Sequence, residues 1–134
     1  MLLLSIQPQY ARKIVAGEKR IEFRRVWAAS PVEQVAIYAT APVCRIVATA
    51  RVAEVVHLSP SALWRYAKSF GAGITRAELF LYLAGCARGY GIVLETVATV
   101  SAPIELKTLS KDSRAPQSFR YLNEIERTVV SRLS

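Results

Sequence analysis

The chain is poor in the residues that usually hold metals. Its 134 residues include one histidine, His57, and one aspartate, Asp112, and its two cysteines, Cys44 and Cys86, have no ligand-like spacing. Zinc and other transition metals are usually bound by clusters of these residue types at short spacings. The sequence therefore predicts no metal site, redox motif or cofactor. Both cysteines are expected to be buried free thiols in a reducing cytoplasm.

Long apolar runs are also absent. The opening MLLLSI has no basic residues before it and gives way to polar residues at Gln7, so it does not resemble a signal peptide. The longest other apolar stretch, residues 35–44, is about half as long as a membrane span and contains Pro42. We therefore expect a cytoplasmic protein that has no membrane partner.

Apolar residues and arginine are abundant. Hydrophobic residues make up 52% of the chain and charged residues 21%, which favours one compact domain spanning residues 1–134. The formal net charge is +8, and arginine supplies 13 of the 18 cationic side chains. Such a chain favours polyanionic partners, because guanidinium groups suit phosphates and base edges. The plainer alternative is a basic surface that only keeps the protein soluble.

Half of the positive charge lies in one short stretch. Residues 12–25 contain six lysines and arginines and two glutamates, a net charge of +4 (6 − 2). Within this stretch, residues 20–25 alternate in polarity as a β-strand does. Such a strand would direct Arg20, Glu22 and Arg24 to one face and the apolar side chains between them to the core. The sequence thus predicts a charged face that can line a binding site.

The remaining patterns predict a mixed α+β domain. Strands are expected at residues 2–6, 34–39, 45–56, 90–100 and near 104–106. Helices are expected from Pro8 to Gly17, from Pro60 to Gly71, from the capping box of Thr75 and Glu78 to Gly85, and at residues 119–133. Residues 107–118 are expected to form a surface loop. Because strands and helices do not alternate regularly, a small closed or nearly closed sheet is favoured over a doubly wound parallel sheet.

With these features in place, the chain resembles the ASCH family of the PUA-like superfold. The matching segments are LLLSIQPQYARKIVAGEKRIEFRR at the start, IYATAPVCRIVA, and PQSFRYL towards the end. The family signature G-x-K-x-x-E-x-R falls on Gly17, Lys19, Glu22 and Arg24. The resemblance implies a small β-pseudobarrel with peripheral helices. It also implies a cleft at the barrel mouth that is lined by the signature and takes RNA, a nucleotide or a nucleoside.

The resemblance leaves the activity open between binding and hydrolysis. Some relatives are amidohydrolases that cleave an acetylated cytidine nucleoside with a signature lysine, a threonine and a glutamate from a helical insertion. This chain has Lys19, carries Glu22 where those relatives have the threonine, and offers Glu78 as the nearest acid in the insertion. Other relatives are nucleic-acid binders or ribonucleases. A protein-binding adaptor is the alternative outside nucleic-acid function.

Seven residues are the candidates for the site. Lys19 and Glu22 are the candidate catalytic pair, because an easily deprotonated lysine can act as base or nucleophile and a carboxylate can orient water. The candidate ligand-binding residues are Arg20, Arg24, Arg25, Ser118 and Arg120. A base would stack on one of four aromatic side chains, namely Trp27, Tyr38, Trp64 or Tyr121. The alternative for the Arg-Glu-Arg row is a structural strand held by salt bridges.

Overall fold

The computed structural model describes all residues from 1 to 134 and has six strands and five helices. The strands are β1 (Leu2–Ile6), β2 (Ile21–Arg24), β3 (Gln34–Ala39), β4 (Arg45–Leu58), β5 (Gly89–Ile104) and β6 (Phe119–Tyr121). The helices are α1 (Pro8–Val15), α2 (Pro60–Ala67), α3 (Arg76–Tyr82), α4 (Leu106–Leu109) and α5 (Glu124–Leu133). All strands belong to one sheet, in the order β2-β5-β4-β3-β1-β6.

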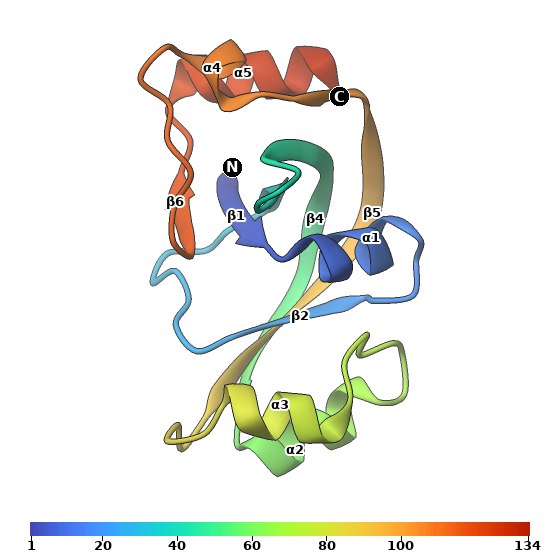
Figure 1. Ribbon diagram of the computed structural model, residues 1–134. Coiled ribbons are helices and arrows are strands. Elements are labelled where there is room, and N and C mark those ends of the chain that lie inside the picture. Colours follow the sequence, from blue (N-terminus) through green and yellow to red (C-terminus); the bar gives the residue numbers. More distant parts are fainter.

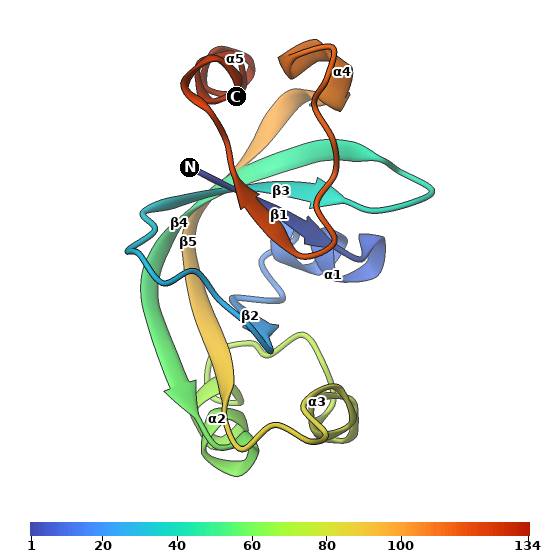
Figure 2. The ribbon, with the colours of Figure 1, turned by 90° about the vertical axis from the view of Figure 1, so that its left-hand side faces the viewer.

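The sheet curls into a half-barrel because its two longest strands bend. β4 and β5 pair antiparallel along most of their length, and their register shifts at three places, each a bulge or irregularity. Bulges bend a strand and increase its twist, which curls the sheet. The two strands run from α4 and α5 at one end of the molecule to α2 and α3 at the other (Figures 1 and 2). The expected mixed α+β fold with a small barrel-like sheet is confirmed.

The first strand shows how the sequence builds the core. β1 is buried on both faces, as its uninterrupted apolar run predicts. Leu2 and Leu4 pack in a cluster with β3, β4, β5 and α1, whereas Leu3 packs in a second cluster that reaches α5. A third cluster joins β2 to α2 and α3. Burial of each leucine stabilises the fold by roughly 1.5–3 kcal/mol.

Two boundaries near the end of the chain differ from the sequence prediction. The helix expected at residues 119–133 begins only at Glu124, because residues 119–121 form β6 and pair antiparallel with β1. Backbone pairing with a buried strand outweighs the helical spacing of the apolar residues here. In addition, β5 continues to Ile104 and is followed by α4, so the short strand expected near 104–106 and part of the expected loop are wrong.

Side-chain exposure also departs from expectation at a cysteine and a tryptophan. Cys44 is exposed rather than buried and has a positive φ of 51°, while Cys86 is half-buried. Trp27, one of the four side chains expected to offer a stacking face to a base, is buried against Phe119. No helix has the length and apolar character needed to cross a membrane. No three His, Cys, Asp or Glu side chains are grouped so that they could hold a metal ion.

Candidate functional site

The signature strand β2 forms one wall of a cleft with a volume of about 640 Å³. The other walls come from β1, α1, α3 and the two residues before β6. A volume of this size is within the range of roughly 300–1,000 Å³ found for small-molecule sites. The cleft therefore brings together segments from both ends of the chain.

Lys19 reaches the cleft because of the turn that ends α1. Gly17 has a positive φ of 81°, and the backbone N–H groups of Glu18 and Lys19 both donate to the carbonyl of Lys13. This left-handed glycine turn is the helix end that the sequence predicts. It directs the Lys19 side chain inward, where only 2% of the residue is exposed.

Lys19 is held as a buried amine at the edge of the cleft. Its Nζ donates to the carbonyl of Ala72 at 2.7 Å and lies 3.9 Å from Glu22 Oε1. The rings of Phe23 and Tyr10 lie 4.7 and 5.3 Å from the same atom. Burial lowers the pKa of Lys19 to about 8, and this effect outweighs the opposing attraction of the Glu22 carboxylate. At pH 7 roughly one lysine in ten is then neutral.

The loop that packs on Lys19 requires a glycine. Gly73 has a positive φ of 66°, and a Cβ atom there would lie 2.5 Å from Cβ and Cγ of Lys19. The Nζ of Lys13 donates to the carbonyl of Gly73 at 3.1 Å, which fastens the loop to α1. The loop can therefore approach Lys19 closely because residue 73 has no side chain, and the hydrogen bond from Lys13 holds it there.

Arg24 connects three segments of the cleft wall. Its Nη1 donates to Glu22 Oε2 and to the carbonyl of Ser5, both at 3.1 Å, and its Nη2 donates to Ser118 Oγ at 2.6 Å. Arg24 is 9% exposed, and its Nε makes no hydrogen bond. Most of the guanidinium group is therefore engaged within the protein. This agrees with the salt-bridged structural interpretation of the Glu22–Arg24 pair.

Of the other two arginines predicted near the signature strand, one lines the cleft and the other does not. Arg25 lines the cleft and is exposed, and its Nη1 donates to the carbonyl of Tyr82 at 3.1 Å. Arg20 does not line this cleft and instead borders a smaller hollow with Gly17 and Glu95. β2 begins only at Ile21: the Arg20 N–H donates to the carbonyl of Gly71, while the Arg20 carbonyl accepts from the Leu94 N–H of β5.

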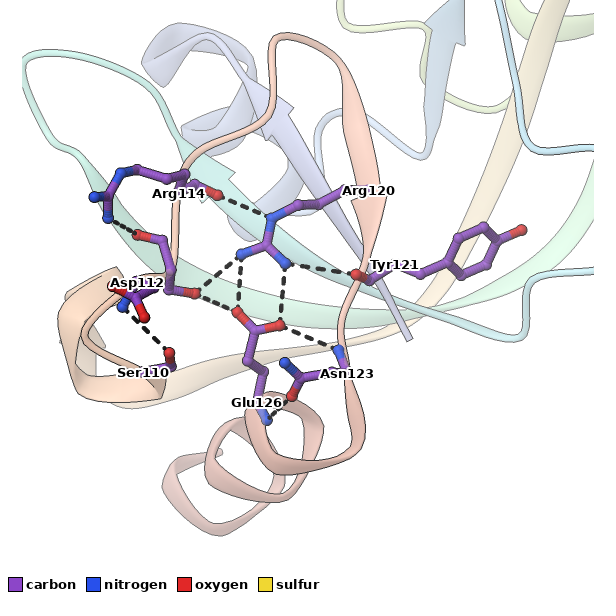
Figure 3. Close-up of polar contacts among 8 residues, drawn as sticks. Ser110, Asp112, Arg114, Arg120, Tyr121, Asn123 and Glu126 are labelled. Carbon is purple, nitrogen blue, oxygen red and sulfur yellow. Dashed lines mark hydrogen bonds and ion pairs between the residues drawn. The ribbon is translucent and has the colours of Figure 1, made fainter.

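Arg120 also lies outside the cleft, in a polar cluster at the start of α5 (Figure 3). Its Nη1 and Nη2 donate to the two oxygens of Glu126 at 3.0 and 2.9 Å, and its Nε donates to the carbonyl of Arg114. Ser113 Oγ donates to the same carboxylate. The hydrogen bond from Arg120 is the largest influence that lowers the pKa of Glu126 to about 2. The side chain expected to bind ligand thus holds β6 to α5.

The segment between Ser113 and Arg120, which we term the strap, links this cluster to the cleft. Within the strap, the carbonyl of Ser118 accepts from the Ser5 N–H at 3.0 Å, and the carbonyl of Pro116 accepts from Ser5 Oγ at 2.7 Å. Gln117 and Ser118 line the cleft. The strap therefore has its middle on the cleft and both ends in the cluster.

The sequence did not indicate the aromatic residues that line the cleft. Tyr10 on α1 and Tyr82 on α3 do so, whereas none of the four expected stacking residues does. Glu78 also lines the cleft and accepts from Tyr10 Oη at 3.2 Å and from the Thr75 N–H at 3.0 Å. Hydrogen bonds from Thr75 lower the pKa of Glu78, which keeps it ionised. The spacing of four between Glu78 and Tyr82 was the available signal, since it places both on one helix face.

The charge of the cleft is mixed. Its lining contains three cations, Lys19, Arg24 and Arg25, and two carboxylates, Glu22 and Glu78. The net charge is thus +1 (3 − 2), a small share of the +8 of the chain. The cleft is amphoteric, and Arg25 is its exposed cation.

The family model for the ASCH domain matches residues 4–115, which include the G-x-K-x-x-E-x-R strand at the cleft. The chain belongs to this family. It is 28% identical over 129 residues to an ASCH domain-containing ribonuclease from Zymomonas mobilis, covering 92% of this chain and 85% of that protein.

Solved structures of ASCH from Zymomonas mobilis share the fold. One has a TM-score of 0.89 and 26% sequence identity, and covers 98% of this chain and 94% of its own. A variant of that protein with a tyrosine replaced by phenylalanine gives a TM-score of 0.88 at 25% identity, over 98% of this chain and 96% of its own. The likeness therefore extends over nearly the whole chain.

Proposed function

We propose that this ASCH domain binds single-stranded RNA, with one nucleotide seated in the cleft. The observation that carries the proposal is the combination of an exposed guanidinium group, Arg25, with two tyrosine rings, Tyr10 and Tyr82, around one cavity. Single-strand binders typically pair cations that track the backbone with aromatic faces on which bases stack. The cleft offers both kinds of group.

The overall charge supports a polyanionic ligand. The net charge of +8 would draw RNA towards the protein, and Arg25 would then contact a phosphate at the cleft. The similar protein from Zymomonas mobilis carries the name ribonuclease, which favours RNA over other polyanions. In this proposal Arg24 supports the cleft wall, and Ser118 presents its hydroxyl from the strap.

A second candidate function is cleavage of the bound RNA, and the lowered pKa of Lys19 favours it. The neutral amine would take the proton of a ribose 2′-hydroxyl, whose oxygen then attacks the adjacent phosphorus. The bond to the 5′-oxygen breaks, and that oxygen leaves with a proton from solvent. Glu22, 3.9 Å away, would stabilise the resulting ammonium group, and Arg25 would offset the charge on phosphate.

Hydrolysis of an N-acylated cytidine is a further candidate, favoured by the position of Glu78. This carboxylate lines the same cleft as Lys19, so the chain has a lysine and two carboxylates at one cavity even though Glu22 replaces a threonine. An assay that offers both acetylated cytidine and single-stranded RNA separates the two reactions.

The binding proposal predicts a specific effect of Arg25→Ala. The variant should bind a short single-stranded RNA about three- to tenfold more weakly at low salt, and the slope of log affinity against log salt should fall by about one. Fluorescence anisotropy at several salt concentrations measures both quantities. Arg127→Ala is the matched control, because Arg127 is an exposed arginine on α5, at the far end of the molecule from α3 (Figure 1).

Two results would contradict the binding proposal. One is an affinity that does not change with salt, and the other is an equal loss in the Arg25 and Arg127 variants. Because Arg25 also bonds to Tyr82, the melting temperature of each variant should be measured alongside binding.

A further inference from the structure

Large apolar side chains stand exposed at the edge of the cleft. Leu81 is 78% exposed, Val26 is 65% exposed and Tyr82 is 38% exposed, and all three line the cleft. We refer to these three residues as the apolar rim. Single exposed apolar side chains are ordinary on protein surfaces, but a group beside a cavity indicates a binding surface.

The rim is built by a contact between two distant parts of the chain. The Arg25 N–H donates to Tyr82 Oη at 3.3 Å, and Arg25 Nη1 donates to the Tyr82 carbonyl at 3.1 Å. Val26 follows Arg25 in the chain, and Leu81 precedes Tyr82, so the contact brings both apolar neighbours to the same edge. These two hydrogen bonds hold the end of β2 against the end of α3, and the apolar side chains of Val26 and Leu81 stay exposed beside them.

The arrangement of charge identifies the ligand that suits the rim. Arg25 is the cation within this contact, and the cleft next to it has room for a small molecule. In a strand of RNA, each base is separated from the next by a sugar and a phosphate, so two neighbouring bases flank one negative charge. A guanidinium group beside both a cleft and an exposed apolar surface is complementary to two successive nucleotides.

We propose that the apolar rim is a second base-binding subsite, which holds the base that flanks the nucleotide in the cleft. The inference rests on the proposed RNA binding and adds the length of strand that the site recognises. Arg25 contacts the phosphate between the two bases, and the flanking base stacks on Tyr82 and packs against Leu81 and Val26. The protein then prefers strands over single nucleotides.

The test compares uridine 5′-monophosphate with a labelled hexauridylate, a strand whose bases stack weakly on one another. The wild-type protein should bind the hexamer at least tenfold more tightly than the monophosphate. Leu81→Ser should weaken hexamer binding about five- to tenfold and monophosphate binding clearly less, because the flanking base is present only in the hexamer. The salt slope should stay the same, because no cation is removed.

Two further variants make the test independent of folding defects. Leu81→Trp should tighten hexamer binding, since an added ring extends the stacking surface at an exposed position, and damage to the fold cannot produce a gain. Ile125→Ser is the control, because Ile125 is 70% exposed but belongs to α5 and does not line the cleft. It should leave both affinities unchanged.

Each remaining outcome contradicts a defined part of the proposal. If monophosphate and hexamer bind equally, or if Leu81→Ser has no effect, the second subsite is wrong while RNA binding stands, and a protein partner becomes the occupant to test for the rim. If neither ligand binds at any salt concentration, the proposed function fails and the subsite fails with it.

Discussion

Lys19 combines two properties that rarely occur together in a lysine, because it is almost fully buried and yet lines a cleft. Burial disfavours the ammonium form, and the nearby charge of Lys13 acts in the same direction. Glu22 and Glu78 oppose this shift but do not cancel it. The result is an amine that can exchange a proton near neutral pH.

Cleavage that depends on neutral Lys19 should follow pH in a defined way. Because the pKa is lowered to about 8, the rate should rise about tenfold per pH unit below pH 8 and level off above it. Lys19→Met should remove activity. Lys13→Met should shift the rise to higher pH, since the Lys13 charge helps to lower this pKa. Initial rates on single-stranded RNA between pH 6 and 9 measure all three.

The control and the contradicting results follow from the same assay. Circular dichroism should confirm that the Lys19 and Lys13 variants remain folded. A rate that is flat from pH 6 to 9, or activity that survives Lys19→Met, would remove Lys19 from the chemistry.

The positions of site residues could be predicted from the sequence where neighbouring residues determine them. The positions of Lys19, Glu22 and Arg24 at the cleft follow from a glycine turn and a short strand, both encoded within residues 17–25. Arg20 borders the smaller hollow instead, and its N–H contacts Gly71, a residue of a distant loop that no local pattern places there.

At the scale of elements, the Arg120 cluster joins β6, the strap and α5. Asn123 caps α5, and its N–H and side chain exchange hydrogen bonds with Glu126. Glu126 therefore serves the helix cap and the Arg120 ion pair at once, and only 3% of the residue is exposed. The cluster fixes both ends of the strap. The middle of the strap places Ser118 at the cleft.

Glu126→Gln should separate these two roles, because glutamine can also complete a capping box. The variant keeps the cap but loses the ion pair, and its free energy of unfolding at pH 7 should fall by about 1–3 kcal/mol. Glu124→Gln is the control, an exposed acidic residue in the first turn of the same helix that should change stability little. Urea denaturation measures both variants.

The effect of Glu126→Gln should depend on pH. The pKa of Glu126 is lowered from 4.5 to about 2 in the folded protein, so the carboxylate stabilises the fold fully above pH 4.5 and progressively less as pH falls towards 2. The difference between wild type and variant should therefore be smaller at pH 3 than at pH 7. An equal difference at both values would contradict the assigned ion pair.

The errors in predicted elements also cluster in this part of the chain. Apolar residues spaced by three and four suggested one helix from Phe119 onward, but residues 119–121 have an unpaired edge of β1 available to them. The Asn123–Glu126 capping box was the local signal for the true start of α5. By contrast, the Thr75–Glu78 capping box was predicted, and the structure confirms it.

At the scale of the whole molecule, the half-barrel brings distant segments to one cleft. The parallel pairing of β1 with β3 and the antiparallel pairing of β1 with β6 place the strap beside β1, and the pairing of β2 with β5 brings the signature into the sheet. The family resemblance anticipated this arrangement, whereas composition and periodicity indicated only a small mixed sheet. The spacing of Glu78 and Tyr82 places both on one face of α3, but that this face and Tyr10 line the same cleft depends on how α1 and α3 pack around β2.

Charge acts over the same large scale. The chain carries +8 but the cleft only +1, so most cations lie where they can attract a polyanion without contacting its seated nucleotide. The surface as a whole is therefore expected to attract RNA over a distance, whereas direct contacts at the cleft and its apolar rim hold the strand in place.

The most direct measurement is an NMR titration of isotope-labelled protein with hexauridylate, which locates the bound RNA residue by residue. The largest amide shifts should fall on Tyr10, Arg25, Tyr82 and Ser118, which surround one cleft although they are far apart in sequence. Shifts concentrated on α5 instead, or no shifts at low salt, would contradict the assignment of this cleft as the RNA site.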